Sequence, residues 1–306
     1  MAITLGGSSF VYNGISQDYS FIETFNCIYE LCDQISIAYG GTDGTNEEVY
    51  NWIRSLPSPL KPIFLYPISE EEWASQQGRE KLSYFSNKAI DNLTSDYNLY
   101  VQSDECVHES CANAIRQAIE TDEESFFCHR LNCWASSYTV LNVSNERKPV
   151  STHVIRLAKT KYRCVGDAES LGLMPSASPD FLNDIRIYHT GFVRDKHKHL
   201  VKIKHIQEDI FLFGEADKRI HDCVDGFDCW KFGFSPADVE PIQEKLPKFI
   251  QQWASEREVD PFKSSDEQLA CDFLIRTGNL NENIIRASVT ETANLIWWQW
   301  AKQHCK

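Results

Sequence analysis

Apolar and polar residues alternate in blocks along the first hundred positions of the chain, and these blocks predict helices and strands in turn. Residues 19–32 carry apolar side chains close to helical spacing, whereas residues 34–41 form a mostly apolar run that stops at two glycines. The alternation then continues as a turn followed by a helix over 41–56, a strand at 61–68, a polar helix through 73–93 and a strand at 97–102. The first third of the chain is therefore predicted to be an α/β unit.

Strands that alternate with helices favour a mostly parallel central sheet flanked by helices. Ligands of such a sheet bind at the carboxyl ends of its strands. Two strand exits are unusually polar, at residues 40–45 and 102–109, and both would lie on that edge. This shared location is the strongest argument that the residue pattern offers for a functional site.

The rest of the chain is more mixed and ends in helical patterns. Strand-like segments lie in about residues 125–205, and the last third of the chain holds helical patterns at 240–256 and at 290–303, the second of which is rich in tryptophan. No repeat or long linker divides the chain. We therefore expect one sheet-bearing domain over residues 1–205, with a helical C-terminal extension over residues 206–306 packed on it.

Composition fits a globular protein without a membrane span. The chain has 306 residues, 42% of them hydrophobic, which is enough for a sizeable core. No apolar run approaches the roughly 18 to 20 residues that a membrane helix needs, and the first residues do not resemble a secretory signal. Eleven cysteines, an odd number, are better explained as free thiols in a reducing compartment than as a disulfide framework. A cytoplasmic location is expected, which would be the host cytoplasm if a phage encodes the chain.

The formal net charge is −14, which argues against a protein that grips nucleic acid over a broad face. One segment departs from this balance. Residues 196–206 (KHKHLVKIKHI) are strongly basic and would form a narrow positive lane on an acidic body. Binding to the phosphates of a restricted site is still compatible with the charge.

The carboxylates at the end of the 97–102 strand are the first candidates for chemistry. Asp104 and Glu105 carry the oxygen ligands that Mg²⁺ and Mn²⁺ prefer, and such ions often bridge one or two carboxylates to substrate phosphates. An alternative is that Asp104 caps a helix beginning at Glu105, with Glu105 complementing the helix dipole. The two interpretations are about equally supported by this segment alone.

A second cluster lies in residues 187–199 (IYHTGFVRDKHKH). His189 could complete a metal site, and Arg194 with the nearby lysines could neutralise a diphosphate. The alternatives are a core histidine and a solvated basic helix face. Asp167, just after a predicted strand, could act as a general base, or it could cap a short helix.

The third cluster is the glycine-rich turn at 39–45 (YGGTDGT). Its glycines allow a backbone to approach a ligand, and Asp43 could hydrogen-bond a base or a ribose. An ordinary loop has the same composition. The turn matches neither the phosphate-binding loop nor the dinucleotide-binding glycine motif.

In their order along the chain, these segments resemble a family-2-type glycosyltransferase of the GT-A fold. The similarity begins with residues 10–45, where a strand, a helix and a second strand lead to the YGGTDGT turn. It continues through residues 85–109 (FSNKAIDNLTSDYNLYVQSDECVHE), which resemble a bacterial and phage subgroup with a Gln-x-Asp-Glu strand end. Residues 126–138, 153–159 and 186–204 are similar to later landmarks, so the resemblance covers about residues 8–205.

The resemblance implies a metal-dependent enzyme that transfers a sugar from a nucleotide-sugar donor, possibly a UDP-sugar, to an acceptor hydroxyl, with inversion by analogy. It implies Mn²⁺ or Mg²⁺ held by Asp104 and His189, and a catalytic base at Asp167 by position alone. The donor-binding residues that it implies are Phe10, Asn13, Tyr39, Asp43, Gln102 and Arg194. Gln102 stands where the family usually has an aspartate, and Ala38 and Tyr39 stand where aspartates often end the second strand.

The acceptor and two competing functions stay open at this point. An envelope glycan or a hydroxymethylated base of phage DNA could receive the sugar, and the −14 charge counts against DNA. The departures at Gln102, Ala38 and Tyr39 favour a non-catalytic binding protein on a degenerate GT-A scaffold as the main alternative. A nucleotidyltransferase shares the sheet and the metal chemistry, but the N-terminal GGSSFVYNG segment lacks the expected basic residue.

Overall fold

The computed structural model describes most of the first two thirds of the chain and one later segment. The described residues are 2–58, 61–134, 139–141, 153–172, 181–194, 198, 202, 239–242 and 244–256, with only the backbone described at 134, 181–183 and 239–241. The predicted helix at 290–303 and the predicted domain boundary at 205/206 lie outside these residues.

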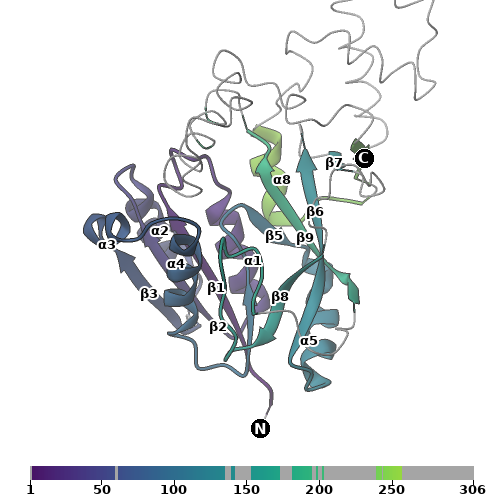
Figure 1. The fold of residues 1–306 in the computed structure, drawn as a ribbon. Helices are drawn as coiled ribbons and strands as arrows, with labels where there is room; N and C mark the ends of the chain where they lie inside the picture. The colour runs from purple at the N-terminus through teal and green to yellow at the C-terminus, as the bar shows by residue number, and fades with distance from the viewer. Residues whose placement is uncertain are drawn as a thin grey trace, which may run out of the picture.

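The described chain is a mixed α/β structure (Figure 1). Its helices are α1 (Phe21–Leu31), α2 (Thr45–Ser55), α3 (Glu70–Ser75), α4 (Glu80–Ile90), α5 (Ala112–Glu120) and α8 (Lys248–Glu256), with a 3₁₀ turn, η1, at Glu109–Cys111. Its strands are β1 (Leu5–Tyr12), β2 (Gln34–Gly40), β3 (Ile63–Ile68), β4 (Tyr97–Tyr100), β5 (Glu105–Val107), β6 (Ser125–Trp134), β7 (Thr139–Leu141), β8 (His153–Lys159), β9 (Phe181–Phe192) and β10 (Val239–Pro241).

The N-terminal half of the sheet is parallel, in the order β3-β2-β1-β4. Each residue along β2 is buried, and its side chains point alternately to the two faces. Ile37 and Tyr39 join the core beneath α1, whereas Ala38 joins a second cluster with Phe85 of α4. Both faces of this half are therefore covered, which explains its nearly continuous apolar strands.

The other half of the sheet is mixed. β8 pairs antiparallel with β4 and with β6, and β9 runs parallel to β6 and antiparallel to β5. Figure 1 shows β6 and β9 crossing the molecule as long neighbouring strands, with α5 at one end of them and α8 at the other. The predicted α/β class, with a central sheet flanked by helices, is confirmed, and the purely parallel part of the sheet is formed by β1–β4.

Three predicted helices differ from the structure for local reasons. The polar helix through 73–93 is divided into α3 and α4 around Gly78, whose φ of +69° is a helix-ending conformation. The helix predicted at 240–256 is confined to α8, which starts directly after Pro247, while β10 pairs with β7. The helix predicted from Glu105 starts only at Ala112, because β5 first adds to the edge of β9.

Candidate active site

Asp104 lies in the turn between β4 and β5, at the carboxyl end of the parallel strands. The following residue opens a strand and not a helix, so the helix-cap interpretation of Asp104 is wrong. Thr190 holds the Asp104 backbone, because its amide N–H and its Oγ1 donate to the Asp104 carbonyl at 2.8 and 3.0 Å. The position of this carboxylate is thus fixed by β9, more than eighty residues further along the chain.

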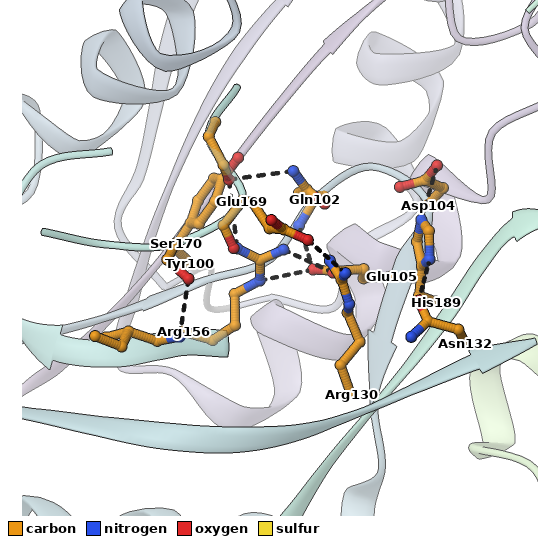
Figure 2. Close-up of polar contacts among 12 residues, drawn as sticks. Tyr100, Gln102, Asp104, Glu105, Arg130, Asn132, Arg156, Glu169, Ser170 and His189 are labelled. Atoms are coloured by element: carbon orange, nitrogen blue, oxygen red, sulfur yellow. Dashed lines mark hydrogen bonds and ion pairs between the residues drawn. The ribbon is translucent and has the colours of Figure 1, made fainter. Parts of the chain in front are cut away.

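His189 faces Asp104 because β5 and β9 pair with Glu105 opposite His189. The imidazole Nε2 lies 3.6 Å from Asp104 Oδ2, and Nδ1 lies 2.9 Å from Asn132 Oδ1 (Figure 2). An amide oxygen only accepts, so Nδ1 carries the proton in this pairing and Nε2 keeps its lone pair. Burial lowers the pKa of His189, which favours this neutral form.

Lys202 is the cation that the structure places against this pair. Its Nζ donates to Asp104 Oδ2 at 2.9 Å and to the Gly191 carbonyl at 3.0 Å, and it lies 5.2 Å from the centre of the Tyr19 ring. Burial lowers the pKa of Lys202 to about 8. Burial would raise the pKa of Asp104, but the charge of Lys202 outweighs it and holds the pKa well below its usual value. Asp104 is therefore an anion with a cation beside it.

The backbone of Gly191 packs closely against the two facing side chains. A Cβ at this position would lie 2.4 Å from His189 Nε2 and 2.9 Å from Asp104 Oδ2, both shorter than real Cβ contacts. The φ of Gly191 is not in the left-handed region. Glycine is therefore required here by the close approach of the two side chains and not by the backbone conformation. Of the residues described so far, Gly191 and Asn132 were not singled out as site residues by the sequence pattern, whereas Lys202 was one of the lysines near Arg194 that were expected to neutralise a diphosphate.

A buried ion pair lies beside this cluster. The Glu105 carboxylate accepts from Arg156 Nε at 2.9 Å and from Arg156 Nη2 at 2.7 Å, and both side chains are completely buried (Figure 2). Burial would raise the pKa of Glu105, but the Arg156 guanidinium outweighs it and lowers the pKa. The available signal for this pair was an arginine within the otherwise apolar HVIRLAK strand.

Asp167 lies in the 165–171 loop after β8 and is partly buried. Its Oδ1 accepts from the Glu169 amide at 3.4 Å. Among the residues that the structure describes, no hydrogen bond or ion pair joins Asp167 to Asp104 or His189. The following residue, Ala168, offers its carbonyl to Gln102 Nε2 at 3.2 Å. The structure thus brings Asp167's loop, though not its carboxylate, against the strand end that carries Asp104.

The predicted donor-side residues of the first two loops brace each other. Asn13 Oδ1 accepts from the Thr42 amide at 2.9 Å, and Asp43 Oδ2 accepts from the Ser16 amide at 2.7 Å. Asp43 Oδ1 also accepts from Thr45 Oγ1 at 2.6 Å. Burial would raise the pKa of Asp43, but these hydrogen bonds lower it. Asn13 and Asp43 therefore hold together the loops that follow β1 and β2.

The remaining predicted donor residues are largely packed inside the protein. Phe10 packs in the aromatic cluster with Phe85. Tyr39 is 3% exposed, and its hydroxyl lies 2.8 Å from that of Tyr50. Arg194 is 2% exposed, donates from Nη1 to the Gln17 carbonyl at 2.6 Å and lies over the ring of Tyr19. Tyr19 thus joins the surroundings of Arg194 to those of Lys202.

Two absences complete the description. Within the described ranges, no three His, Cys, Asp or Glu side chains are arranged to hold a metal ion. None of the helices that the structure describes combines the length and hydropathy needed to span a bilayer.

No family model and no curated protein sequence matches the chain. Solved structures do show a distant likeness. S. aureus TarS 1–349 in complex with UDP is 14% identical, with 88% of this chain and 83% of that chain covered and a TM-score of 0.36. The same protein in complex with UDP-GlcNAc gives 13% identity, the same coverage and a TM-score of 0.37. A Bacillus anthracis structure titled as a glucose-1-phosphate thymidylyltransferase, in complex with a sucrose, is 10% identical over 51% of this chain and 72% of that one, with a TM-score of 0.34.

Proposed function

We propose that the chain is a glycosyltransferase that uses a nucleotide-sugar donor, with a UDP-sugar as the first candidate, and a divalent metal ion. The observation that carries the proposal is the pairing of Asp104 with His189 at the carboxyl edge of the parallel strands. Ligands of parallel α/β sheets bind at that edge. The resemblance of residues 8–205 to family-2-type enzymes supplies the reaction class.

The residues at this pair fit a divalent ion such as Mn²⁺ or Mg²⁺. A carboxylate oxygen and an imidazole lone pair face each other at 3.6 Å, and Gly191 lies beside both without a side chain of its own. The hydrogen bond from His189 Nδ1 to Asn132 orients the ring in the way that metal-binding histidines are usually held. Two protein ligands suit an ion that takes its other ligands from water and substrate oxygens.

A metal ion at this position would neutralise the charge that develops on the diphosphate leaving group. The chain adds its own positive groups to this task. Lys202 lies 2.9 Å from Asp104, and Arg194 lies against the same Tyr19 ring. We propose that Lys202 moves from Asp104 to the donor diphosphate when metal and donor bind. Its positive charge would then neutralise Asp104 in the free protein and the diphosphate in the complex.

The acceptor hydroxyl needs a base to take its proton as the bond to the sugar forms. Asp167 is our choice, since its loop packs on Gln102 at the strand end that carries Asp104. Attack from the side opposite to the leaving diphosphate would invert the sugar centre. An envelope glycan is the proposed acceptor class, because the net charge of −14 disfavours duplex DNA.

Calorimetric titration of UDP-sugars with and without Mn²⁺ tests the proposal. We expect donor binding to tighten at least about tenfold with Mn²⁺, and donor hydrolysis to be lost in Asp104→Asn. A matched control is Asp96→Asn, because Asp96 is an exposed carboxylate bonded to Thr4 at the other end of β4. Unchanged metal dependence in Asp104→Asn would refute the metal assignment.

One observation favours a second function, a binding protein without catalysis. Lys202 already supplies a cation to Asp104, so a donor could bind at this site with no metal ion. In that case UDP-sugars would bind equally well with Mn²⁺ and with a chelator, and neither hydrolysis nor transfer would be detected.

A further inference from the structure

The buried Glu105–Arg156 pair connects two loops, the 102–105 turn and the 165–171 loop. Stabilisation of the core alone would not require this connection. On one side, Glu105 Oε2 also accepts from the Gln102 amide at 3.0 Å, and the Glu105 amide donates to the Gln102 carbonyl at 2.9 Å. These bonds close the 102–105 turn that carries Asp104. The carboxylate of Glu105 therefore shapes the turn as well as binding Arg156.

On the other side, Arg156 binds the backbone of the 165–171 loop. Its Nη1 donates to the Glu169 carbonyl at 2.5 Å and lies 3.4 Å from the Ala168 carbonyl. Arg130 reinforces this side, because its Nη2 lies 2.6 Å from Glu169 Oε1 and its Nη1 lies 3.9 Å from Glu105 Oε1 (Figure 2). The guanidinium of Arg156 thus spans from the carboxylate behind Asp104 to the carbonyls that follow Asp167.

The 165–171 loop has a shape that needs such support. Ala168 has a φ of +59°, a left-handed conformation that is costly for a residue with a Cβ. Its side chain is completely buried, so the loop is pressed onto the sheet at this residue. Ser170 accepts from the Ile155 amide at 3.2 Å, which fixes the end of the loop to β8.

We propose that Arg156 and Glu105 are positioning residues that hold the 165–171 loop, and with it Asp167, against the 102–105 turn. A fully buried ion pair is a poor source of net stability, because desolvation cancels most of its attraction. Its value here is geometric, since a guanidinium donates along fixed directions to a carboxylate and to carbonyls at once. The proposal rests on the proposed function for the role of Asp167.

Arg156→Lys tests this role, because lysine keeps the charge but cannot reach both Glu105 oxygens and the loop carbonyls from one nitrogen. The matched control is Arg116→Lys, since Arg116 also binds a carboxylate through two nitrogens, at Asp33 near the start of β1. In Arg156→Lys we expect kcat for sugar transfer to fall at least about tenfold while the donor KM changes less than about threefold. In Arg116→Lys both constants should stay within about twofold.

A double-mutant cycle separates positioning from a general structural effect. If Arg156 acts through Asp167, Arg156→Lys combined with Asp167→Asn should be no slower than Asp167→Asn alone. Additive losses, or an unchanged kcat in Arg156→Lys, would overturn the inference. Should Arg156→Lys fail to fold, Glu169→Gln replaces it, because that carboxylate is 43% exposed and its loss weakens the link between the 165–171 loop and Arg130.

Amide hydrogen exchange makes the test independent of activity. Exchange in residues 165–171 should accelerate at least about tenfold in Arg156→Lys and stay at the wild-type rate in Arg116→Lys. Faster exchange with no transfer by the wild-type protein would support the loop attachment and refute the proposed function. Wild-type exchange rates in both variants would refute the attachment, whatever the enzyme does.

Discussion

Gly191→Ala is the substitution for which the structure gives the most direct expectation. The added Cβ would lie 2.4 Å from His189 Nε2, 2.8 Å from His189 Cε1 and 2.9 Å from Asp104 Oδ2. The imidazole cannot simply rotate away, because Nδ1 is bonded to Asn132 and the ring packs edge-on against Phe192 at 5.5 Å between ring centres. The extra methyl group must therefore displace His189, Asp104 or the strand β9 itself.

The size of the displacement follows from ordinary contact distances. Real Cβ contacts essentially never fall below 3.0 Å, so the His189 ring must retreat by at least roughly 0.6 Å. A misplacement of about 1 Å at a reacting site commonly costs on the order of a hundredfold, and overpacking costs about 1 to 3 kcal/mol of stability. We expect Mn²⁺-linked donor affinity to fall at least about tenfold, which corresponds to about 1.4 kcal/mol.

Calorimetric titration of UDP-sugar with Mn²⁺ measures the affinity, and thermal unfolding of the same samples measures the stability. Gly78→Ala is the control, because its Cβ would approach only Glu80 Oε2, at 3.3 Å, in the turn before α4. That variant should lose about 1 kcal/mol of stability from its left-handed backbone and keep wild-type affinity. Full metal-linked affinity in Gly191→Ala, with the fold intact, would refute the placement of the metal between Asp104 and His189.

Other perturbations test other parts of the same structure. Asn132→Ala removes the acceptor that orients His189, so Mn²⁺ affinity by calorimetry should fall roughly 10- to 100-fold. Because the His189 Nδ1–H then loses its buried partner, stability should fall by about 1 to 3 kcal/mol. Glu105→Gln leaves the buried Arg156 charge poorly compensated, and urea unfolding should show a loss of about 3 to 5 kcal/mol. The pKa of Asp33 lies below its usual value because of the hydrogen bond from Arg116, so its stabilisation is present above about pH 4 and is lost as the pH falls through the lowered pKa. Asp33→Asn should cost roughly 1 kcal/mol at pH 7, a figure kept small because the pair is partly exposed, and the difference from wild type should shrink toward pH 3.

The elements of the parallel half of the sheet were predictable because their cause is local. Apolar runs such as residues 34–41 are buried on both faces, and α1 lies within residues 19–32 as its apolar spacing predicts. The position of Asp104 at a strand end was predictable for the same reason. Here the pattern of each segment agrees with its final environment.

The environment of Asp104 was not predictable, because it depends on pairing between distant strands. Residues 105–120 contain good helix-forming positions, yet Glu105 to Val107 pair with β9 because that pairing extends the sheet. The role of Asn132 depends on the register that places it opposite His189 in the β6–β9 pair. No local pattern records which of several asparagines will meet a given histidine.

Lys198 and Lys202, the residues of the basic segment that the structure describes, have carboxylate partners that the sequence did not predict. From its composition alone, the basic segment 196–206 suggests a surface that could bind the phosphates of DNA. In the structure, Lys198 Nζ lies 3.0 Å from Asp18 and Lys202 Nζ lies 2.9 Å from Asp104, and Lys202 is only 8% exposed. A lysine that must first leave a buried carboxylate gives up that ion pair on binding, so it favours a ligand that enters the site over a surface that passes across it. The charges of these two lysines are thus already paired with carboxylates of the same chain, which weakens the argument from sequence for a basic lane that binds DNA.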